Sequence, residues 1–482
     1  MKAITFLLTG LLLLGHWSQA KAQDGTAADV EAVRLLVGSH PDDLDKQMKP
    51  FYKKNKKNAE HLAAFARIFC DDGDTIHANT YANHALEVSK YKSAPAYVVL
   101  GDLETMADRK ENAASLYDQA LLVDSMYEPA YFKFADLFRK SDVAKAIAKL
   151  EELRSRQPQA AIDAYAARIY YDAKTYDKAL ESYDKADLTK LDSSDLRNFA
   201  MSAFVRGQAE KSLGVAKYGL STQPRSALLN RLAFYNSVKL KKYDEGLGYG
   251  DALFNKSDSA TFNYTDYACY GNAFFGTKQY DKAVEQYLKA LEQDDLSNKA
   301  ERTGIVKQLS DSYEKKSDFA NAIKYYKEFL DNTEHPSAND LEDYAALYVK
   351  HGSTLEGEAQ TEAFKKAIEA YANLAAQHES AIEYATFMQA RLNRKLDPDQ
   401  TQGLAKPFYE KMAILVGSKG DLDAVDKTRM TESLLYLISY YLFHENDKES
   451  AVGYANQLLD IDPDNEIAKE VLESGQEEQQ QQ

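Results

Sequence analysis

Small residues return along the chain at a nearly constant interval, and each return marks the buried face of a helix. Seven such anchor positions follow one another every 33 to 37 residues: Ala78, Ala113, Ala146, Ala179, Ser212, Gly246 and Ala283. Ala179 is followed by Tyr183 after four residues and by Ala186 after seven, and other anchors repeat this arrangement. Spacings of four and seven bring side chains onto one face of an α-helix. The pattern predicts one amphipathic helix in each repeat of about 34 residues.

A second helix is predicted in front of each anchor. Residues 160–173, AAIDAYAARIYYDA, have helical apolar spacing before Ala179, and polar turns such as residues 71–74 connect the two helices. A proline twelve residues after an anchor ends one repeat and starts the next; such prolines are Pro158, Pro224 and Pro463. The later anchors, Ala322, Ala367, Ala405 and Ala451, lie 38 to 46 residues apart. We expect their extra residues to form longer turns, near 297–304 and 353–362.

The stretch RIYYDAKTYDKALESYDKA at residues 168–186 resembles the tetratricopeptide repeat (TPR), a helix–turn–helix unit with small and aromatic residues in its second helix. The early Trp of that family is replaced here by aromatic residues three positions before their anchors: Tyr176, Tyr243, Tyr280 and Phe319. This replacement accounts for a chain with 33 Tyr whose one Trp lies at position 17. The resemblance implies an all-α fold, a right-handed α-solenoid of stacked helix-turn-helix repeats with about eleven units.

The chain divides into five predicted segments. They are a signal peptide (1–22), N-terminal cap helices (23–57), a regular TPR array (58–332), divergent TPR-like helical repeats (333–474) and a disordered tail (475–482). The signal peptide is indicated by Lys2, by the apolar run at 4–14 and by Ala20-Lys21-Ala22, which places cleavage before Gln23. The apolar run is too short to span a bilayer, and no Cys follows it to carry a lipid. We therefore expect an exported protein in the periplasm, with an extracellular location as the alternative.

The formal net charge of −16 limits the classes of molecule that we expect the protein to bind. An acidic chain repels phosphate backbones and anionic lipid, so we expect neither nucleic-acid binding nor membrane insertion. The P-loop, dinucleotide-binding, nucleophile-elbow and zinc-protease motifs do not occur in the sequence. The sequence therefore predicts a protein that is not an enzyme and that needs no cofactor.

Two stretches carry side chains of the metal-ligand type, and both fit ordinary turns better than metal sites. The first contains Asp71, Asp72, Asp74, His77 and His84, where acids are expected before a helix. The second, residues 460–471, has acids at positions 1, 3 and 5 of a calcium loop but lacks its glycine and its final acid. We expect no metal. We also expect Cys70 and Cys269 to be mostly buried free thiols, because six repeats separate them.

The resemblance also implies a binding surface, because first-helix side chains in TPR proteins line a concave groove that holds peptides or partner segments. With each anchor taken as position 20, the family's groove positions are 2, 5, 9, 12 and 13. They give these candidates for a partner-binding groove: Arg67, Asp71, Asp102, Asp136, Arg139, Lys140, Arg168, Tyr171, Asp172, Arg197, Met201, Asn272, Phe275, Lys307 and Asp311. The family's carboxylate grip uses Lys and Asn, whereas Lys307 is accompanied here by Asp311.

The leading functional hypothesis is a non-enzymatic protein–protein interaction scaffold of the bacterial cell envelope, which binds a peptide or partner protein in the TPR groove. The alternative is a glycan-binding helical protein of nutrient uptake, in which Tyr171 and Phe275 could stack on a sugar. A further alternative is an enzyme that uses irregular insertions in residues 333–430, although no nucleophile–base pair is visible there. The individual groove residues also have a plain reading, as solvated faces of amphipathic helices.

Overall fold

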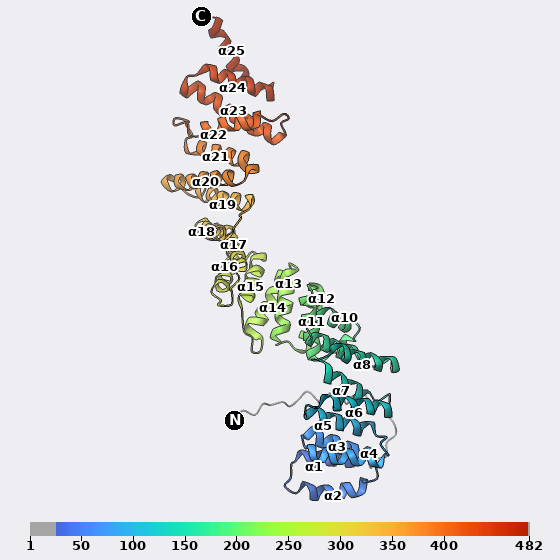
Figure 1. The fold of residues 1–482 in the computed structure, drawn as a ribbon. Coiled ribbons are helices and arrows are strands. Elements are labelled where there is room, and N and C mark those ends of the chain that lie inside the picture. Colours follow the sequence, from blue (N-terminus) through green and yellow to red (C-terminus); the bar gives the residue numbers. More distant parts are fainter. Residues whose placement is uncertain (1–25, 481–482) are drawn as a thin grey trace. The chain divides into compact units, whose positions relative to one another are not determined.

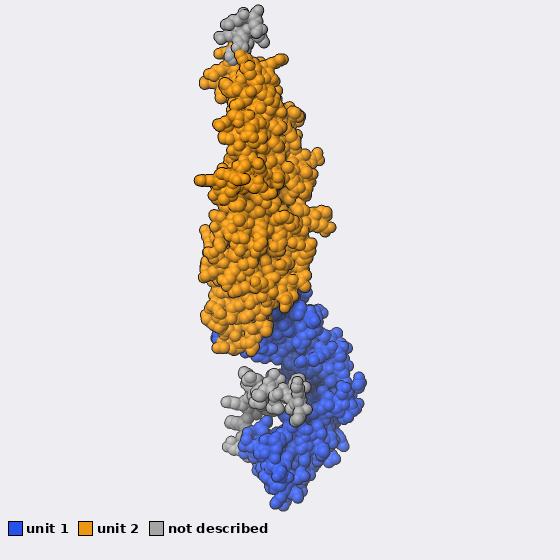
Figure 2. Space-filling view, turned by 90° about the vertical axis from the view of Figure 1, so that its left-hand side faces the viewer, with its two compact units in different colours: residues 1–224 blue, residues 225–482 orange. Residues whose placement is uncertain are grey.

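The computed structural model describes residues 26–480, and these fold entirely into helices joined by short connections (Figure 1). The predicted signal peptide lies outside the described residues. The chain forms two compact units, Met1–Pro224 and Arg225–Gln482, which Figure 2 colours separately. Among the described helices, none is long and apolar enough to cross a membrane.

Unit 1 begins with two helices that precede the repeats and continues as five helix pairs. Its elements are α1 (Thr26–Gly38), α2 (Leu44–Asn55), α3 (Ala59–Asp72), α4 (Thr75–Val88), α5 (Ala94–Met106), α6 (Lys110–Val123), α7 (Glu128–Phe138), α8 (Val143–Arg156), α9 (Asp163–Asp172), α10 (Tyr176–Tyr183), the 3₁₀ turn η1 (Leu188–Lys190), α11 (Ser193–Val205) and α12 (Ala209–Thr222). From α3 onward, odd-numbered helices are the first and even-numbered helices the second of each pair.

Unit 2 continues the alternation. Its elements are α13 (Ala227–Lys239), α14 (Tyr243–Lys256), α15 (Tyr264–Gly276), α16 (Tyr280–Leu291), α17 (Lys299–Lys315), α18 (Phe319–Asn332), α19 (Ala338–Gly352), α20 (Gly357–Gln377), the 3₁₀ turn η2 (Glu379–Ala381), α21 (Ile382–Leu396), α22 (Lys406–Gly417), α23 (Ala424–Tyr440), the π-helical turn η3 (Tyr441–Glu445), α24 (Lys448–Ile461) and α25 (Glu466–Gln480). Figure 1 shows the pairs stacked in chain order within each unit.

The anchors lie where the repeat pattern places them, in the second helices. Ala179 in α10 and Ala283 in α16 are completely buried, and Ala405 is buried immediately before α22. The aromatic residue four positions after an anchor is buried as well, as Tyr183 and Tyr287 show. The small anchor lets two helices approach closely while the ring fills the space beside it. The predicted all-α solenoid of stacked TPR-like repeats is therefore confirmed.

A turn with fixed geometry separates the two helices of a repeat. The residue five positions before the anchor has a positive φ angle in most repeats, for example 89° at Gly73, 57° at Lys174 and 61° at Lys278. This left-handed residue ends the first helix, because it turns the chain out of the α conformation. Glycine adopts it most easily, yet Lys174 and Lys278 hold it here. The tight turn keeps the interval from the first helix to the anchor constant.

At the two predicted segments, 297–304 and 353–362, the wider spacing of the later anchors comes mainly from longer helices, so the prediction of longer turns is wrong there. The connection between α21 and α22, residues 397–405, is a longer turn. Residues 299–304 belong to α17, which Asn298 caps by accepting bonds from the backbone N–H groups of Ala300 and Glu301. Residues 357–362 belong to α20, which has 21 residues. Both segments are rich in Ala, Glu, Lys and Gln, which favour helix when nothing breaks it. Residues 475–480, predicted to be disordered, likewise continue α25, and residues 481–482 lie outside the described part.

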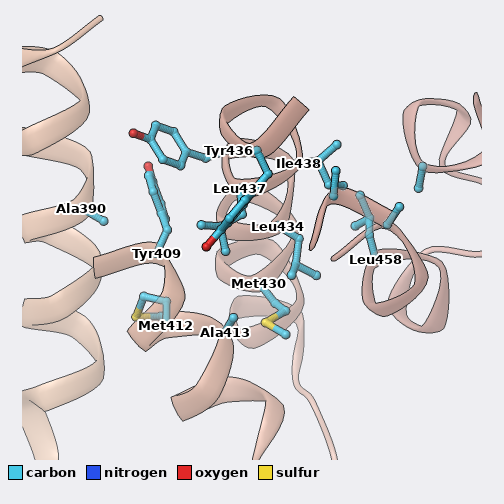
Figure 3. Packing of buried hydrophobic residues seen from close by; sticks show 14 of the residues in the cluster. Ala390, Tyr409, Met412, Ala413, Met430, Leu434, Tyr436, Leu437, Ile438 and Leu458 are labelled. Atoms are coloured by element: carbon cyan, nitrogen blue, oxygen red, sulfur yellow. The ribbon is translucent and has the colours of Figure 1, made fainter. Parts of the chain in front are cut away.

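The core of unit 2 near the C-terminus is built from aromatic and aliphatic side chains of α22, α23 and α24. Tyr409, Met412, Leu434 and Leu437 are completely buried there (Figure 3). Tyr436 stacks at an angle on Tyr409, with ring centroids 4.6 Å apart. This cluster fixes the face of α23 that is turned toward α21 and α22.

The two cysteines are free thiols. Cys70 in α3 is buried in unit 1, and burial raises the pKa of its thiol to about 11. Cys269 in α15 belongs to unit 2 and is only partly buried. The prediction of two free thiols is confirmed, but Cys269 is more accessible than expected.

Candidate functional site

Many of the groove candidates in unit 1 bind one another across successive first helices. Arg67 in α3 reaches Asp102 in α5 with its guanidinium, at 2.6 Å, and also contacts Asp71 at 3.3 Å. Asp102 is 6% exposed and accepts a second bond from the Tyr117 hydroxyl, at 2.7 Å. Burial opposes the charge on Arg67, but the nearby Asp102 more than offsets it, and the pKa of Arg67 is raised. These three candidates therefore hold adjacent repeats together.

The same arrangement recurs from α7 to α11. Arg139, just after α7, lies 3.5 Å from Asp136 and 3.6 Å from Asp172 of the next first helix. Arg168 in α9 forms a charge-assisted bond of 2.6 Å with Asp195 in α11, whose side chain is 1% exposed. A planar guanidinium suits such paired contacts with a carboxylate.

The remaining candidates of unit 1 have less specific surroundings. Arg197 donates to the Gln223 side chain at 2.7 Å. Tyr171 packs edge-on against Tyr176, the aromatic residue that opens α10, with centroids 5.7 Å apart. Lys140 is exposed, and Met201 is partly buried. None of these side chains joins a cluster of groove candidates among the described residues.

In unit 2, Lys307 in α17 binds Asp340 in α19 at 2.6 Å and lies 4.6 Å from the centre of the Phe329 ring. Asp311 lies one turn further along α17, and burial raises its pKa to about 6, although Lys307 acts in the opposite direction. Phe275 packs edge-on against Tyr280, the opening residue of α16. Lys307 is thus occupied by an acid of the following repeat.

These contacts define a set that we call the first-helix ion pairs, in which a cation of one first helix binds an acid of the next first helix within one unit. They are Arg67–Asp102, Arg139–Asp172, Arg168–Asp195, Arg231–Asp266, Lys307–Asp340 and Arg391–Glu432. Three other pairs, Lys133–Asp102, Lys350–Glu314 and Arg429–Glu383, join successive first helices in the opposite direction. Breaking a buried pair leaves an uncompensated charge in a poorly hydrated place. Most of the charged groove candidates therefore help to hold successive repeats together.

One part of the surface formed by the first helices contains a cavity that no ion pair fills. A cavity of about 480 Å³ lies over α13, α15 and α17, and we call it the groove pocket. It is lined by Tyr235, Val238, Lys239, Tyr264, Thr265, Ala268, Cys269, Asn272, Glu301, Gly304, Ile305 and Gln308. Its size is in the range of ordinary ligand pockets.

The groove pocket combines an apolar surface with a few oriented polar groups. The Asn272 side-chain oxygen accepts a bond of 2.7 Å from the Tyr287 hydroxyl, which leaves the amide N–H groups for the pocket. The Tyr235 hydroxyl donates to Asp266 at 2.7 Å, so its ring is held in place at the wall. Among the described residues, Lys239 at the rim forms no ion pair within 4.0 Å. Such a site can hold an apolar side chain while donating hydrogen bonds to a carbonyl oxygen.

Most residues that line the groove pocket stand at the family's groove positions, although only Asn272 among them was selected as a candidate from the sequence. Tyr235, Val238 and Lys239 occupy positions 9, 12 and 13 of their repeat, and Thr265 and Ala268 occupy positions 2 and 5 of the next. The sequence reading favoured charged and aromatic side chains and passed over small ones. Small residues at groove positions are the signal that could have identified the cavity, since a hollow forms where side chains are short.

The stretches with metal-ligand side chains are structural in the described residues. His77 is held between Asp74, at 2.6 Å, and Asp45, at 2.7 Å, so both ring nitrogens are engaged. Asp462 receives a bond from Asn465 in the turn between α24 and α25. Within residues 26–480, no group of three or more His, Cys, Asp or Glu side chains is arranged to hold a metal ion.

A family model and several solved structures match parts of the chain. The family model for the tetratricopeptide repeat matches residues 134–195, which run from α7 into α11. No curated protein matches the chain. Among solved structures, the chain is similar to the C-terminal part of a TPR repeat-containing protein from Cytophaga hutchinsonii, with 22% identity over 57% of this chain and 99% of that one and a TM-score of 0.41.

It is also similar to a tetratricopeptide repeat protein from Parabacteroides merdae, with 17% identity over 53% of this chain and 98% of that one and a TM-score of 0.32. The evidence for the family is the model match in unit 1, together with the same helix pairs, anchors and buried tyrosines on both sides of it. Repeats of this type are in general protein–protein interaction modules. Residues 134–195 match the tetratricopeptide repeat family, and the helix pairs on both sides of them have the same repeat architecture.

Proposed function

We propose that this protein is a non-enzymatic scaffold of the bacterial cell envelope that binds a peptide or a segment of a partner protein in its TPR groove. The groove pocket over α13, α15 and α17 is the observation that supports this proposal. It lies at the family's groove positions of three successive repeats, and it is not filled by side chains of the chain itself. An extended segment would place an apolar side chain between Tyr235 and Tyr264 and a backbone carbonyl on the Asn272 amide.

Gly304 gives the sharpest test of the pocket. A Cβ added at this position in α17 would meet no atom of the protein within 4 Å, so Gly304→Leu should start without a clash and extend into the cavity that Gly304 lines. Gly248 in α14 is a matched control, because it is also open and helical but lies outside the pocket. Both changes replace a helical glycine and should slightly stabilise the protein.

The assay selects short random peptides, displayed on phage, against the immobilised wild-type chain. We expect the enriched peptides to bind wild type and Gly248→Leu equally, and to lose at least about tenfold in affinity for Gly304→Leu. Peptides that bind Gly304→Leu as tightly as wild type would show that the groove pocket is not the binding site. Failure to enrich any peptide would count against the peptide-binding function itself.

Location in the envelope is part of the same proposal. It is supported by the N-terminal Lys2, the apolar run at 4–14 and the small residues before Gln23. The acidic charge favours a protein partner over nucleic acid. Expression in a Gram-negative bacterium followed by fractionation should recover a periplasmic chain whose first residue is Gln23. A cytoplasmic chain that keeps its first 22 residues would overturn the export proposal.

A further inference from the structure

A second cavity lies in unit 1, where the cap helix α2 meets α4. It has a volume of about 590 Å³, within the range of ordinary ligand pockets, and is lined by Tyr52 of α2 and by side chains of α4. Because α4 is the second helix of its repeat, this cavity lies outside the surface that the first helices form. We call it the α4 pocket.

Tyr52 forms the α2 side of the α4 pocket and is held there by aromatic contacts. Its ring packs edge-on against Tyr81, with centroids 6.1 Å apart, and lies 5.4 Å from the ring of His84. Tyr81 is itself buried and stacks on Phe69 at 5.4 Å. Tyr52 nevertheless remains 39% exposed. A ring that is fixed on one side and open on the other can support the apolar face of a ligand.

His77 fixes α2 against α4 at the same cavity. Its Nδ1 atom lies 2.6 Å from Asp74, and its Nε2 atom lies 2.7 Å from Asp45 of α2. Burial disfavours the charged ring, but the hydrogen bonds to Asp74 and Asp45 outweigh this effect, so the pKa of His77 is raised. Both nitrogens are engaged within the protein, so His77 positions α2 and its Tyr52 and is not itself available to a ligand.

The α4 side of the pocket carries a row of polar side chains. Asn79, Asn83 and Glu87 follow at intervals of four residues and so share one helix face, over about 12 Å of the axis. Asn83 donates to the side-chain oxygen of Asn79 at 3.0 Å, which leaves the Asn79 amide N–H groups and the Asn83 oxygen for a ligand. Thr80 donates to the Ile76 carbonyl and keeps its oxygen as an acceptor. Within residues 26–480, Glu87 forms no ion pair within 4.0 Å.

The composition of the lining narrows the ligand class. Among the described side chains that line the α4 pocket, none is Lys, Arg or aliphatic. An anion would therefore find no such cation to bind, and a lipid or an aliphatic segment would find no matching surface. A sugar ring matches the lining, because it has C–H groups on its face and hydroxyls at its rim that both donate and accept hydrogen bonds.

We propose that the α4 pocket binds a neutral oligosaccharide. Tyr52 supports the C–H face of one sugar ring, and Asn79 and Asn83 bind the hydroxyls of that ring. Glu87, two helical turns from Asn79, accepts from hydroxyls of the next sugar unit.

The α4 pocket is separate from the other sites considered for this chain. The groove pocket lies on first helices of unit 2, so the sugar site does not depend on the function proposed for it. It also differs from the sugar-stacking residues considered from the sequence, Tyr171 and Phe275. Those are first-helix residues that pack against the aromatic residues opening α10 and α16.

The test titrates the full mature chain with neutral hexasaccharides of glucose, galactose, mannose and xylose, and with the hexasaccharide of galacturonic acid. Calorimetry should detect at least one neutral hexasaccharide with a Kd below about 1 mM. The galacturonic acid hexasaccharide should bind at least about tenfold more weakly than that one, because Glu87 repels it and the lining offers it no Lys or Arg. No binding of any neutral hexasaccharide at about 10 mM overturns the proposal, and so does tighter binding of the charged one.

Variants of Tyr52 show whether the ring carries the binding. Tyr52→Phe keeps the ring and should bind the same hexasaccharide within about twofold of wild type. Tyr52→Ala removes the ring and should bind at least about tenfold more weakly. Tyr218→Ala in α12 is the matched control, because Tyr218 is 36% exposed and does not line the pocket. It should leave the affinity unchanged.

Asn83→Ala separates a loss of contact from a loss of folding. Asn83 is exposed on α4 and Ala is the better helix former, so the unfolding midpoint should not fall while the affinity falls about fivefold. Gly304→Leu should leave the affinity for the sugar unchanged, since Gly304 lines only the groove pocket of these two cavities. The proposal is overturned if Tyr52→Ala or Asn83→Ala binds as tightly as wild type, or if Gly304→Leu abolishes binding.

Discussion

Gly271 in α15 links the packing of a repeat to the groove pocket. A Cβ atom added at this position would lie 2.5 Å and 2.6 Å from the Cε1 and Cδ1 atoms of Tyr287. Tyr287 is buried beside its anchor, Ala283, and its hydroxyl holds the side chain of Asn272 at 2.7 Å. Gly271→Ala therefore forces the ring to move, and the ring cannot move without disturbing the hydrogen bond to Asn272.

The expected change in the free energy of unfolding is the sum of three effects. Replacing a helical glycine by alanine stabilises a helix by about 1 kcal/mol. Overpacking a buried ring costs about 1–3 kcal/mol, and loss of the Tyr287–Asn272 bond costs about 1 kcal/mol more. The net expectation is a destabilisation of about 1–3 kcal/mol, although alanine has the higher helix propensity.

Gly248→Ala is the matched control, because no atom lies within 4 Å of an added Cβ there and the same substitution should stabilise by about 1 kcal/mol. Urea unfolding followed by circular dichroism gives the sign of the change in the free energy of unfolding for each variant. Hydrogen exchange in α15 and α16 shows where in the structure the change occurs. We also expect Gly271→Ala to weaken peptides bound in the groove pocket. If Gly271→Ala is as stable as wild type, the close packing of Tyr287 on α15 is not as described.

Three further outcomes follow from the same contacts. Asp266→Ala should lower the free energy of unfolding by about 3 kcal/mol, because it leaves Arg231 unpaired; an unchanged urea midpoint would contradict this. Asp311→Asn should stabilise by about 1–2 kcal/mol at pH 7, after allowance for screening, and by nothing at pH 4. The raised pKa of about 6 means that the native state holds the proton longer than the unfolded state, so wild-type stability falls as pH rises from about 4 to 6; parallel pH profiles for the two proteins would refute it. Ala179→Leu should overpack a fully buried contact and cost about 1–3 kcal/mol, and an unaltered melting curve would argue against the anchor assignment.

The sequence was a good guide to the fold because the features that define it are short-range and repeated. Ala179 and Tyr183 lie one helical turn apart, so their pattern reports one helix directly. The turn before each anchor was less visible. Its left-handed residue is glycine at Gly73 but lysine at Lys174 and Lys278, so composition alone does not mark the position. Backbone hydrogen bonds of the turn, such as those from the N–H groups of Lys174 and Thr175 to the carbonyls of Tyr171 and Tyr170, hold the lysine in a conformation that its local preference disfavours.

The contacts of the groove candidates could not be predicted, because a groove position states where a side chain is and not what it contacts. Arg168 was selected from its groove position, whereas Asp195 lies 27 residues further along the chain and binds it. Pairing over such distances depends on how repeats stack, which one helix pattern does not contain. Ala268 and Gly304 were not selected as candidates, yet they line the groove pocket, which forms because their side chains are small or absent.

Ion pairs between successive first helices run in both directions along each unit. In each first-helix ion pair the cation belongs to the earlier repeat and the carboxylate to the later one, as Arg231 in α13 and Asp266 in α15 illustrate. Lys133, Lys350 and Arg429 instead bind acids of the preceding first helix. Asp266 and Asp340 also lie in the first turn of their helices, where negative charge is favoured. A carboxylate on a first helix can also serve both neighbours, as Asp102 does with Arg67 of the repeat before it and Lys133 of the repeat after it, so a duplicated repeat could meet an opposite charge on either side.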